Sequence, residues 1–192
     1  LKKDGLDMQK AELKGAEEFA IECSVLKVAI SEDVQNTSDD GIQIFGGMGF
    51  SAETPMESAW RDSRIGRIYE GTNEINRMLS VGMFLKKGMK GELDLMGAVL
   101  KCKKEINDYG NFDEQEIFGE EKQVLKNLKK VFLLLLGNSV EKFGPKIEER
   151  QQVLLSLSDM LIEIYLSEST LLRTEKNISK ENDQKIKIMM TK

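Results

Sequence analysis

The stretch DGIQIFGGMGFSAETPMESAWRDSRIGRIYEGTNEINRMLSVG, residues 40–82, alternates helix-forming segments with positions at which a helix stops or starts. Gly46 and Gly47 are typical of a helix C-terminus, because glycine readily adopts the left-handed conformation that often ends a helix. Pro55 suits the first turn of the next helix, where no backbone N–H is needed. Thr72 is a good N-cap for a third helix. The stretch therefore predicts three successive helices joined by short turns.

Apolar residues spaced three or four apart predict further helices on both sides of this stretch. Upstream, one long helix is expected from about Met8 to about Phe45, with a face formed by Ala16, Phe19, Ala20, Cys23, Leu26, Ile30, Val34, Thr37, Gly41 and Ile44. Downstream, the same spacing predicts helices near residues 93–106, 124–144 and 153–172, with a polar connection over 108–116. The sequence lacks strand-like alternation of useful length, so the predicted fold class is all-α.

The segment KKGMKGE, residues 86–92, combines glycine with charge and marks the predicted boundary between two parts of the chain. Residues 1–90 form the first predicted helical part, and residues 91–192 a second, antiparallel helical region. The segment NISKENDQKIK, residues 177–187, loses the helical spacing and is expected to fray. The leucine-rich stripes of the second part are more typical of a packed core than of a lipid-binding surface.

Composition excludes several classes of function. The net charge is −5 and basic residues are scattered among acidic ones, which argues against a nucleic-acid-binding surface. The sequence has no histidine, which excludes Ser-His-Asp and Cys-His catalysis and removes the commonest metal ligand, so we expect no metal site. Cys23 and Cys102 fit no metal or redox spacing and are typical of reduced thiols in an intracellular protein. The longest apolar run, residues 131–137, is too short for a transmembrane segment.

Glu70 lies in the junction IYEGT, residues 68–72, between two predicted helices, and two interpretations are open. In the first, it is a solvated carboxylate near a helix N-terminus, where negative charge is favoured. In the second, Gly71 lets a ligand approach the backbone closely and Tyr69 supplies an apolar wall. A half-buried Glu70 would then act as a general base.

Two motifs within residues 40–82 resemble the C-terminal helical domain of the acyl-CoA dehydrogenases, flavoproteins that desaturate acyl-CoA thioesters. They are QIFGG followed by GF, and RDSRIGRIYEGTNEI, in the order and spacing of that family. The resemblance covers roughly residues 10–90. It implies part of a C-terminal four-helix bundle, which in the family follows a helical domain and a β domain. The chain, which starts at Leu1, is therefore expected to be a C-terminal fragment of a longer enzyme.

The resemblance implies roles for individual positions. Glu70 matches the catalytic base that removes the α-proton of the thioester while a hydride passes to FAD, and Tyr69 and Gly71 match the lining of the substrate slot. Cofactor contacts are implied for two segments. Thr72, Asn73 and Glu74 match residues that contact the flavin nucleotide of the same subunit. Gln43, Ile44, Phe45, Gly46 and Gly47 match residues that contact the adenosine diphosphate part of FAD in a neighbouring subunit, which implies a homo-oligomer, either a dimer or a tetramer.

Further expectations follow from the same resemblance. The Asn73 and Glu74 pair and the region after about residue 91 are similar to the very-long-chain type, which favours a long-chain acyl-CoA substrate in fatty acid β-oxidation. The implied partner is electron-transferring flavoprotein or a similar acceptor, and peripheral membrane contact through the extension is a further hypothesis. The expected location is the cytoplasm of a bacterium or the mitochondrion of a eukaryote, and the chain alone is expected to be inactive. The alternative is a non-catalytic helical assembly or interaction module derived from the same fold.

Overall fold

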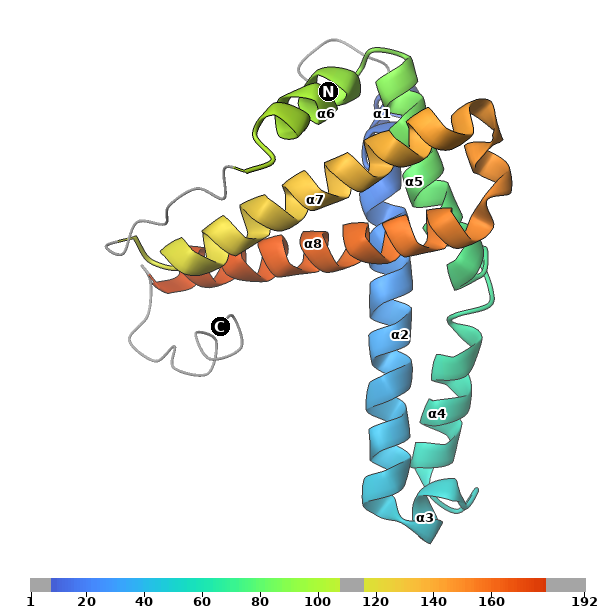
Figure 1. Ribbon diagram of the computed structural model, residues 1–192. Coiled ribbons are helices and arrows are strands. Elements are labelled where there is room, and N and C mark those ends of the chain that lie inside the picture. Colours follow the sequence, from blue (N-terminus) through green and yellow to red (C-terminus); the bar gives the residue numbers. More distant parts are fainter. Residues whose placement is uncertain (1–7, 108–115, 179–192) are drawn as a thin grey trace. The chain divides into compact units, whose positions relative to one another are not determined.

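The computed structural model describes residues 8–107 and 116–178, which form helices joined by short turns (Figure 1). No strand occurs in these two ranges, and the all-α prediction is confirmed. The chain divides into two compact units, residues 1–85 and 86–192. In chain order the helices are α1 (Met8–Glu18), α2 (Ala20–Phe45), α3 (Gly47–Phe50), α4 (Pro55–Ile65), α5 (Asn73–Met89), α6 (Leu95–Lys104), α7 (Gly119–Phe143), the 3₁₀ helix η2 (Gly144–Glu149) and α8 (Gln151–Ile178).

The first unit is built on α2, which runs beside α4 (Figure 1) and also contacts α1 and α3. The prediction of one helix from Met8 to Phe45 is wrong at one position, because the helix is interrupted at Phe19 (φ −98°, ψ 16°). Backbone hydrogen bonds still cross the interruption, from Phe19 to Gly15 at 3.2 Å and from Cys23 to Phe19 at 2.9 Å. The break is therefore a local distortion that leaves the apolar spacing on either side in phase.

The turns after α2 occur at the residues where the sequence predicts them. Gly46 ends α2 with a φ of +61°, and its N–H donates to the carbonyl oxygen of Gln43 at 3.2 Å. Pro55 is the first residue of α4. Thr72 immediately precedes α5, and its hydroxyl oxygen accepts a hydrogen bond from the Ile75 N–H at 3.3 Å. The predicted N-cap is confirmed.

The buried face of α2 differs from the predicted face. Its buried residues are Ser24, Val25, Val28, Gln35 and Ser38, whereas Cys23, Ile30, Val34 and Ile44 of the predicted face are exposed. Small residues let α4 approach closely: a Cβ added to Gly41 would lie only 2.7 Å from the Met56 Cε atom. Much of the apolar stripe visible in the sequence is thus left outside the core, and part of it lines the groove described below.

In the second unit, α6 and α8 each pack against α7, and η2 turns the chain so that α8 returns antiparallel to α7 (Figure 1). The buried side chains of α7 include Leu125, Phe132 and Leu136. Val124, Leu128 and Leu135, which share the three–four spacing of this helix, are instead 52%, 43% and 44% exposed, so the buried stripe of α7 is narrower than the apolar spacing indicates. Residues 108–115 of the predicted connection over 108–116, and the part of the predicted fraying segment beyond residue 178, lie outside the described residues.

Contacts of α7 with its neighbours are close and include several ion pairs. A Cβ added to Gly137 would lie 2.4 Å from Cγ1 of Val99, so α6 and α7 meet where a side chain is absent. Lysine–glutamate pairs bind α7 to α6 and α8: Lys103–Glu141, Lys122–Glu175 and Lys129–Glu168. Across the described ranges, every helix falls short of the length and apolarity that a bilayer crossing requires.

Candidate functional site

The junction between α4 and α5 holds Glu70 in a rare backbone conformation. Its φ is +54°, in the left-handed region that residues with side chains seldom adopt, and Gly71 follows with a φ of +83°. Glycine adopts such angles without steric cost, but for glutamate the conformation costs roughly 1–2 kcal/mol. Strain of this kind persists only where surrounding contacts enforce it, and it clusters at functional sites.

Glu70 lies on one wall of a groove of about 500 Å³ that is lined mainly by apolar atoms. The other wall is one face of α2, formed by Cys23, Leu26, Lys27, Ile30, Ser31 and Val34, while Asp62, Ser63, Gly66 and Tyr69 flank Glu70. The half-buried position considered for Glu70 in the second interpretation is not observed, because both Glu70 and Tyr69 are exposed. An apolar groove with a carboxylate on its wall can hold an apolar ligand and present a base to it.

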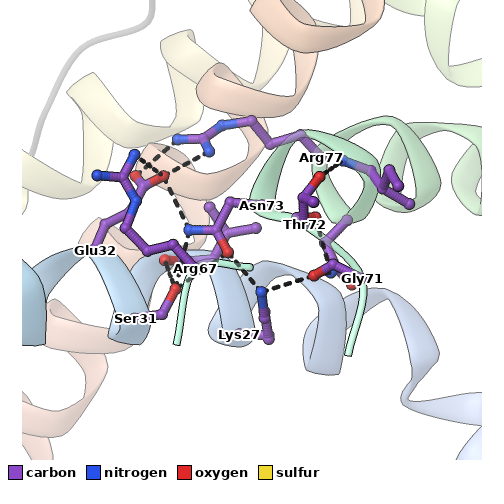
Figure 2. A network of polar contacts seen from close by, with 11 residues as sticks. Lys27, Ser31, Glu32, Arg67, Gly71, Thr72, Asn73 and Arg77 are labelled. Carbon is purple, nitrogen blue, oxygen red and sulfur yellow. Dashed lines mark hydrogen bonds and ion pairs between the residues drawn. The ribbon is translucent and has the colours of Figure 1, made fainter. Parts of the chain in front are cut away.

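A network of polar contacts holds the junction against α2 (Figure 2). Nζ of Lys27 donates to the carbonyl oxygen of Gly71 at 2.8 Å and to Oδ1 of Asn73 at 2.7 Å. Asn73 is fully buried, and its Nδ2 donates to Oγ of Ser31 at 2.9 Å and to Oε1 of Glu32 at 3.1 Å. Both ends of the Asn73 amide are therefore paired with side chains of α2, which fixes its orientation.

Glu32 accepts hydrogen bonds from a second residue of α5. Nη1 and Nη2 of Arg77 donate to its two carboxylate oxygens at 2.7 and 2.8 Å, and Nη2 of Arg67 lies 3.6 Å from Oε1 (Figure 2). The Arg77 hydrogen bonds outweigh the effect of partial burial and, with Asn73, hold the pKa of Glu32 below its ordinary value. The carboxylate is thus charged at neutral pH and ties the start of α5 to α2.

The first turn of α5 also shapes the junction. Nδ2 of Asn76 donates to the carbonyl oxygens of Gly71 at 2.8 Å and Thr72 at 3.1 Å. The pKa of the exposed Glu74 carboxyl is lowered by a hydrogen bond from its own backbone N–H and another from the Thr72 hydroxyl. The side chain of Asn73, one of the residues expected at the flavin nucleotide, is buried within the polar network. Of residues 72–74, Thr72 is half-buried and Glu74 is exposed.

The segment Gln43–Gly47 lies at the other end of α2, beside α3 (Figure 1), and the structure does not bring it to Glu70. Lys27, at the groove, and Gln43 are 16 positions apart along α2, which corresponds to about 24 Å of helix. Ile44 is 83% exposed, and a Cβ added to Gly46 or Gly47 would meet no atom within 4 Å. This turn therefore offers an open backbone to another molecule.

The sequence analysis did not single out the residues that hold the junction: Lys27, Ser31, Glu32, Arg67, Asn76 and Arg77. Lys27 had a detectable signal, because it interrupts the apolar stripe formed by Cys23, Ile30 and Val34 at helical spacing. A charge on such a face predicts a partner for that charge. The partners themselves lie more than forty positions away, and nothing in a single sequence pairs them.

Comparisons with known proteins point to one family. Two family models, each described as "Acyl-CoA dehydrogenase, C-terminal domain", match residues 6–82 and 127–192. A probable acyl-CoA dehydrogenase of Bacillus subtilis is 40% identical over 184 residues, which is 95% of this chain and 30% of that protein. The mitochondrial very long-chain specific acyl-CoA dehydrogenase of Homo sapiens is 41% identical over 99 residues, 51% of this chain and 14% of that protein.

A solved structure matches along nearly the whole chain. It is an acyl-CoA dehydrogenase complexed with FAD from Bacillus anthracis, 39% identical with a TM-score of 0.89, and the match covers 98% of this chain and 33% of that chain. The chain thus spans about a third of the length of the two Bacillus relatives. With its two motifs, its all-α fold, both family models and these relatives in agreement, the chain belongs to the acyl-CoA dehydrogenase family.

Proposed function

We propose that this chain provides the C-terminal part of an FAD-dependent acyl-CoA dehydrogenase, which introduces an α,β double bond into acyl-CoA thioesters. The observation that carries the proposal is the position of Glu70, a carboxylate on the wall of a mainly apolar groove and on a strained, firmly held junction. Because the Bacillus relatives are about three times as long, the described helices alone are expected to be inactive.

Glu70 is the proposed base. Its carboxylate takes the α-proton of the thioester, and the electron pair of that C–H bond becomes the second bond between Cα and Cβ as the β-hydrogen leaves as hydride. FAD, when bound, accepts that hydride. Negative charge develops on the thioester carbonyl oxygen during proton removal, and the Glu70 N–H is the donor that stabilises it. Tyr69 and Gly71 line the slot in which the thioester lies.

Two segments have the properties that an FAD site needs. Gly46 and Gly47 present an open backbone that a pyrophosphate can approach closely, beside the exposed side chains of Ile44 and Phe45. At the start of α5, Thr72 and Glu74 offer oxygen atoms to the hydroxyl groups of a flavin nucleotide. Since about 24 Å of helix separates the groove from the glycine turn, we assign the two segments to different FAD molecules, as in a homo-oligomer in which Gln43–Gly47 serves the neighbouring subunit.

Finer expectations about substrate and acceptor follow from the resemblance of the sequence to the very-long-chain type. We expect a long-chain acyl-CoA substrate in fatty acid β-oxidation, because the match to the human very long-chain enzyme extends over 99 residues and this chain carries a second helical unit. Electron-transferring flavoprotein or a similar protein is the expected acceptor. With relatives in Bacillus and in mitochondria, the expected location is the cytoplasm of a bacterium or the mitochondrion of a eukaryote.

Peripheral membrane contact is a separate expectation for the second unit. Val124, Leu128, Val131 and Leu135 of α7 are between 43% and 52% exposed and lie on one side of the helix. Liposome flotation of the complete enzyme, with and without residues 91–192, tests whether this surface meets lipid. Equal flotation of the two proteins would remove the membrane role.

The proposed activity is tested with the complete, purified enzyme. We expect a flavin absorption spectrum that acyl-CoAs bleach under anaerobic conditions, with long-chain thioesters more effective than short ones. A colourless protein, or a flavin that no acyl-CoA reduces, would contradict the proposal and favour the alternative, a non-catalytic helical assembly module of the same fold.

A further inference from the structure

We propose that Lys27 is a positioning residue for Glu70, fixing where the carboxylate lies across the groove without itself touching the substrate. The inference rests on the proposed role of Glu70 as the base. Lys27 belongs to the α2 wall of the groove, and its ammonium reaches across to the carbonyl oxygen of Gly71 at 2.8 Å and to Oδ1 of Asn73 at 2.7 Å. Both acceptors lie within three residues of Glu70.

Two side chains donate to the carbonyl oxygen of Gly71, and they belong to different helices. Asn76 lies in α5, the helix that directly follows the junction, and its Nδ2 donates to the carbonyl oxygens of Gly71 and Thr72. It therefore sets the local shape of the junction and moves with it. Lys27 lies in α2, 44 positions before Gly71, so it sets the distance between the junction and the opposite wall of the groove.

The ammonium of Lys27 is itself held in a fixed position. Its second acceptor, Asn73, is fully buried and is held in turn by Ser31 and Glu32 of the same helix α2. The stem of Lys27 lies on a face of α2 between exposed Cys23 and Ile30. Because Asn73 cannot shift without breaking several buried contacts, the ammonium cannot follow a moving junction and restrains it instead.

Loss of this restraint has a chemical consequence. The φ of +54° at Glu70 is strained, and a strained conformation relaxes when a contact that enforces it is removed. Relaxation would move the carboxylate relative to the α-carbon of the substrate. A misplacement of about 1 Å can lower a reaction rate by about 100-fold. Removing Lys27 should therefore slow proton abstraction more than it weakens substrate binding.

The test is rapid mixing of the complete, FAD-loaded enzyme with a long-chain acyl-CoA. For Lys27→Met we expect the flavin reduction rate at saturating substrate to fall about 10- to 100-fold, with the substrate Kd changed by less than about twofold. Lys27→Arg keeps hydrogen-bond donors on the same helix and should recover most of the rate. In a Glu70→Gln background, Lys27→Met should cause no further loss, because the base that it positions is absent.

A matched control is Lys129→Met, which makes the same substitution at a lysine of α7 that pairs with Glu168 and should leave the reduction rate unchanged. An unchanged rate per bound flavin in Lys27→Met, with only a lower Tm, would show a purely structural role and overturn the inference. So would an equal loss in the wild-type and Glu70→Gln backgrounds. If Lys27→Met does not fold, Lys27→Gln is judged by the same criteria. Absence of any bleaching in the wild type would instead refute the proposed function.

Discussion

The two terminal nitrogens of the Arg77 guanidinium donate to the two carboxylate oxygens of Glu32, at 2.7 and 2.8 Å, and so join α5 to α2. A paired contact of this kind fixes orientation as well as distance. The side chains are 17% and 26% exposed, so solvent and salt screen the pair less than they screen a pair on the open surface. The first two turns of α5, and with them the Glu70 junction, are therefore anchored to the helix that forms the opposite wall of the groove.

The first prediction concerns acid stability. Arg77 lowers the pKa of Glu32 in the folded protein below its ordinary value of 4.5. A lowered folded-state pKa contributes stability that is fully present above the unfolded-state value and is lost as pH falls through the folded-state value. We expect the free energy of unfolding to decline below about pH 4.5, and Glu32→Gln to flatten that decline. Urea unfolding of both proteins between pH 3 and 7 measures how the free energy of unfolding depends on pH. The same pH dependence in the wild type and in Glu32→Gln would contradict the account.

The second prediction concerns the buried amide of Asn73. Asn73→Asp would remove the donor to Glu32 and place a second carboxylate beside it, where Asn73 now lies 3.1 Å from Oε1. We expect a loss of about 1–3 kcal/mol in the free energy of unfolding, because a buried acceptor loses its partner. Asn36→Asp, at an exposed position of α2, is the control and should change stability little. Similar unfolding midpoints for the two variants would contradict this role for Asn73.

The third prediction separates strain from chemistry at Glu70. Glu70→Gly should raise the free energy of unfolding by about 1 kcal/mol, because glycine accepts a positive φ without the steric cost that glutamate incurs. Glu70→Gln keeps the side-chain length and the strain, so its stability should match the wild type. Both variants should lose flavin reduction by acyl-CoA. Differential scanning calorimetry with activity assays tests the comparison, and a Glu70→Gly protein less stable than Glu70→Gln would refute the strain.

The fourth prediction concerns the contact between α6 and α7. Gly137→Ala would place a Cβ 2.4 Å from Cγ1 of Val99, and overpacking of this kind costs about 1–3 kcal/mol. Val99→Ala in the same protein should recover part of that loss. Gly82→Ala, in α5, is the control: nothing lies within 4 Å of its added Cβ, and the better helix propensity of alanine should stabilise it by about 0.5–1 kcal/mol. Thermal unfolding measures the Tm of both variants. Equal Tm values for Gly137→Ala and Gly82→Ala would refute the close contact.

The helices and turns of this fold could be predicted from the sequence because their signals are local. Three–four spacing marks the helices, and Gly46, Pro55 and Thr72 occupy the positions where helices end or begin in the structure. Which apolar face packs inside the unit could not be predicted. On α2 the buried face includes serine and glutamine, while Ile30 and Val34 line a groove, and spacing alone does not distinguish the two faces.

The candidate site was only partly predictable for a different reason. Glu70 and the glycine turn were found from motifs, which are contiguous in sequence. The contacts that hold Glu70 in place join Lys27 and Glu32 to residues 35 or more positions later, and a single sequence contains no pairing signal over that distance. Burial of Asn73 likewise arises from tertiary packing, which the spacing of residues in one sequence does not reveal.

The central claim is that Glu70 removes the α-proton, and single-turnover flavin reduction in Glu70→Gln tests it most directly. The substitution keeps the shape of the side chain and removes its basicity. The complete enzyme carrying Glu70→Gln should retain its flavin and bind acyl-CoA with nearly unchanged Kd, while the rate of flavin bleaching falls by at least about 100-fold, as expected for loss of general-base catalysis. A Glu70→Gln enzyme that is bleached at the wild-type rate would contradict the account.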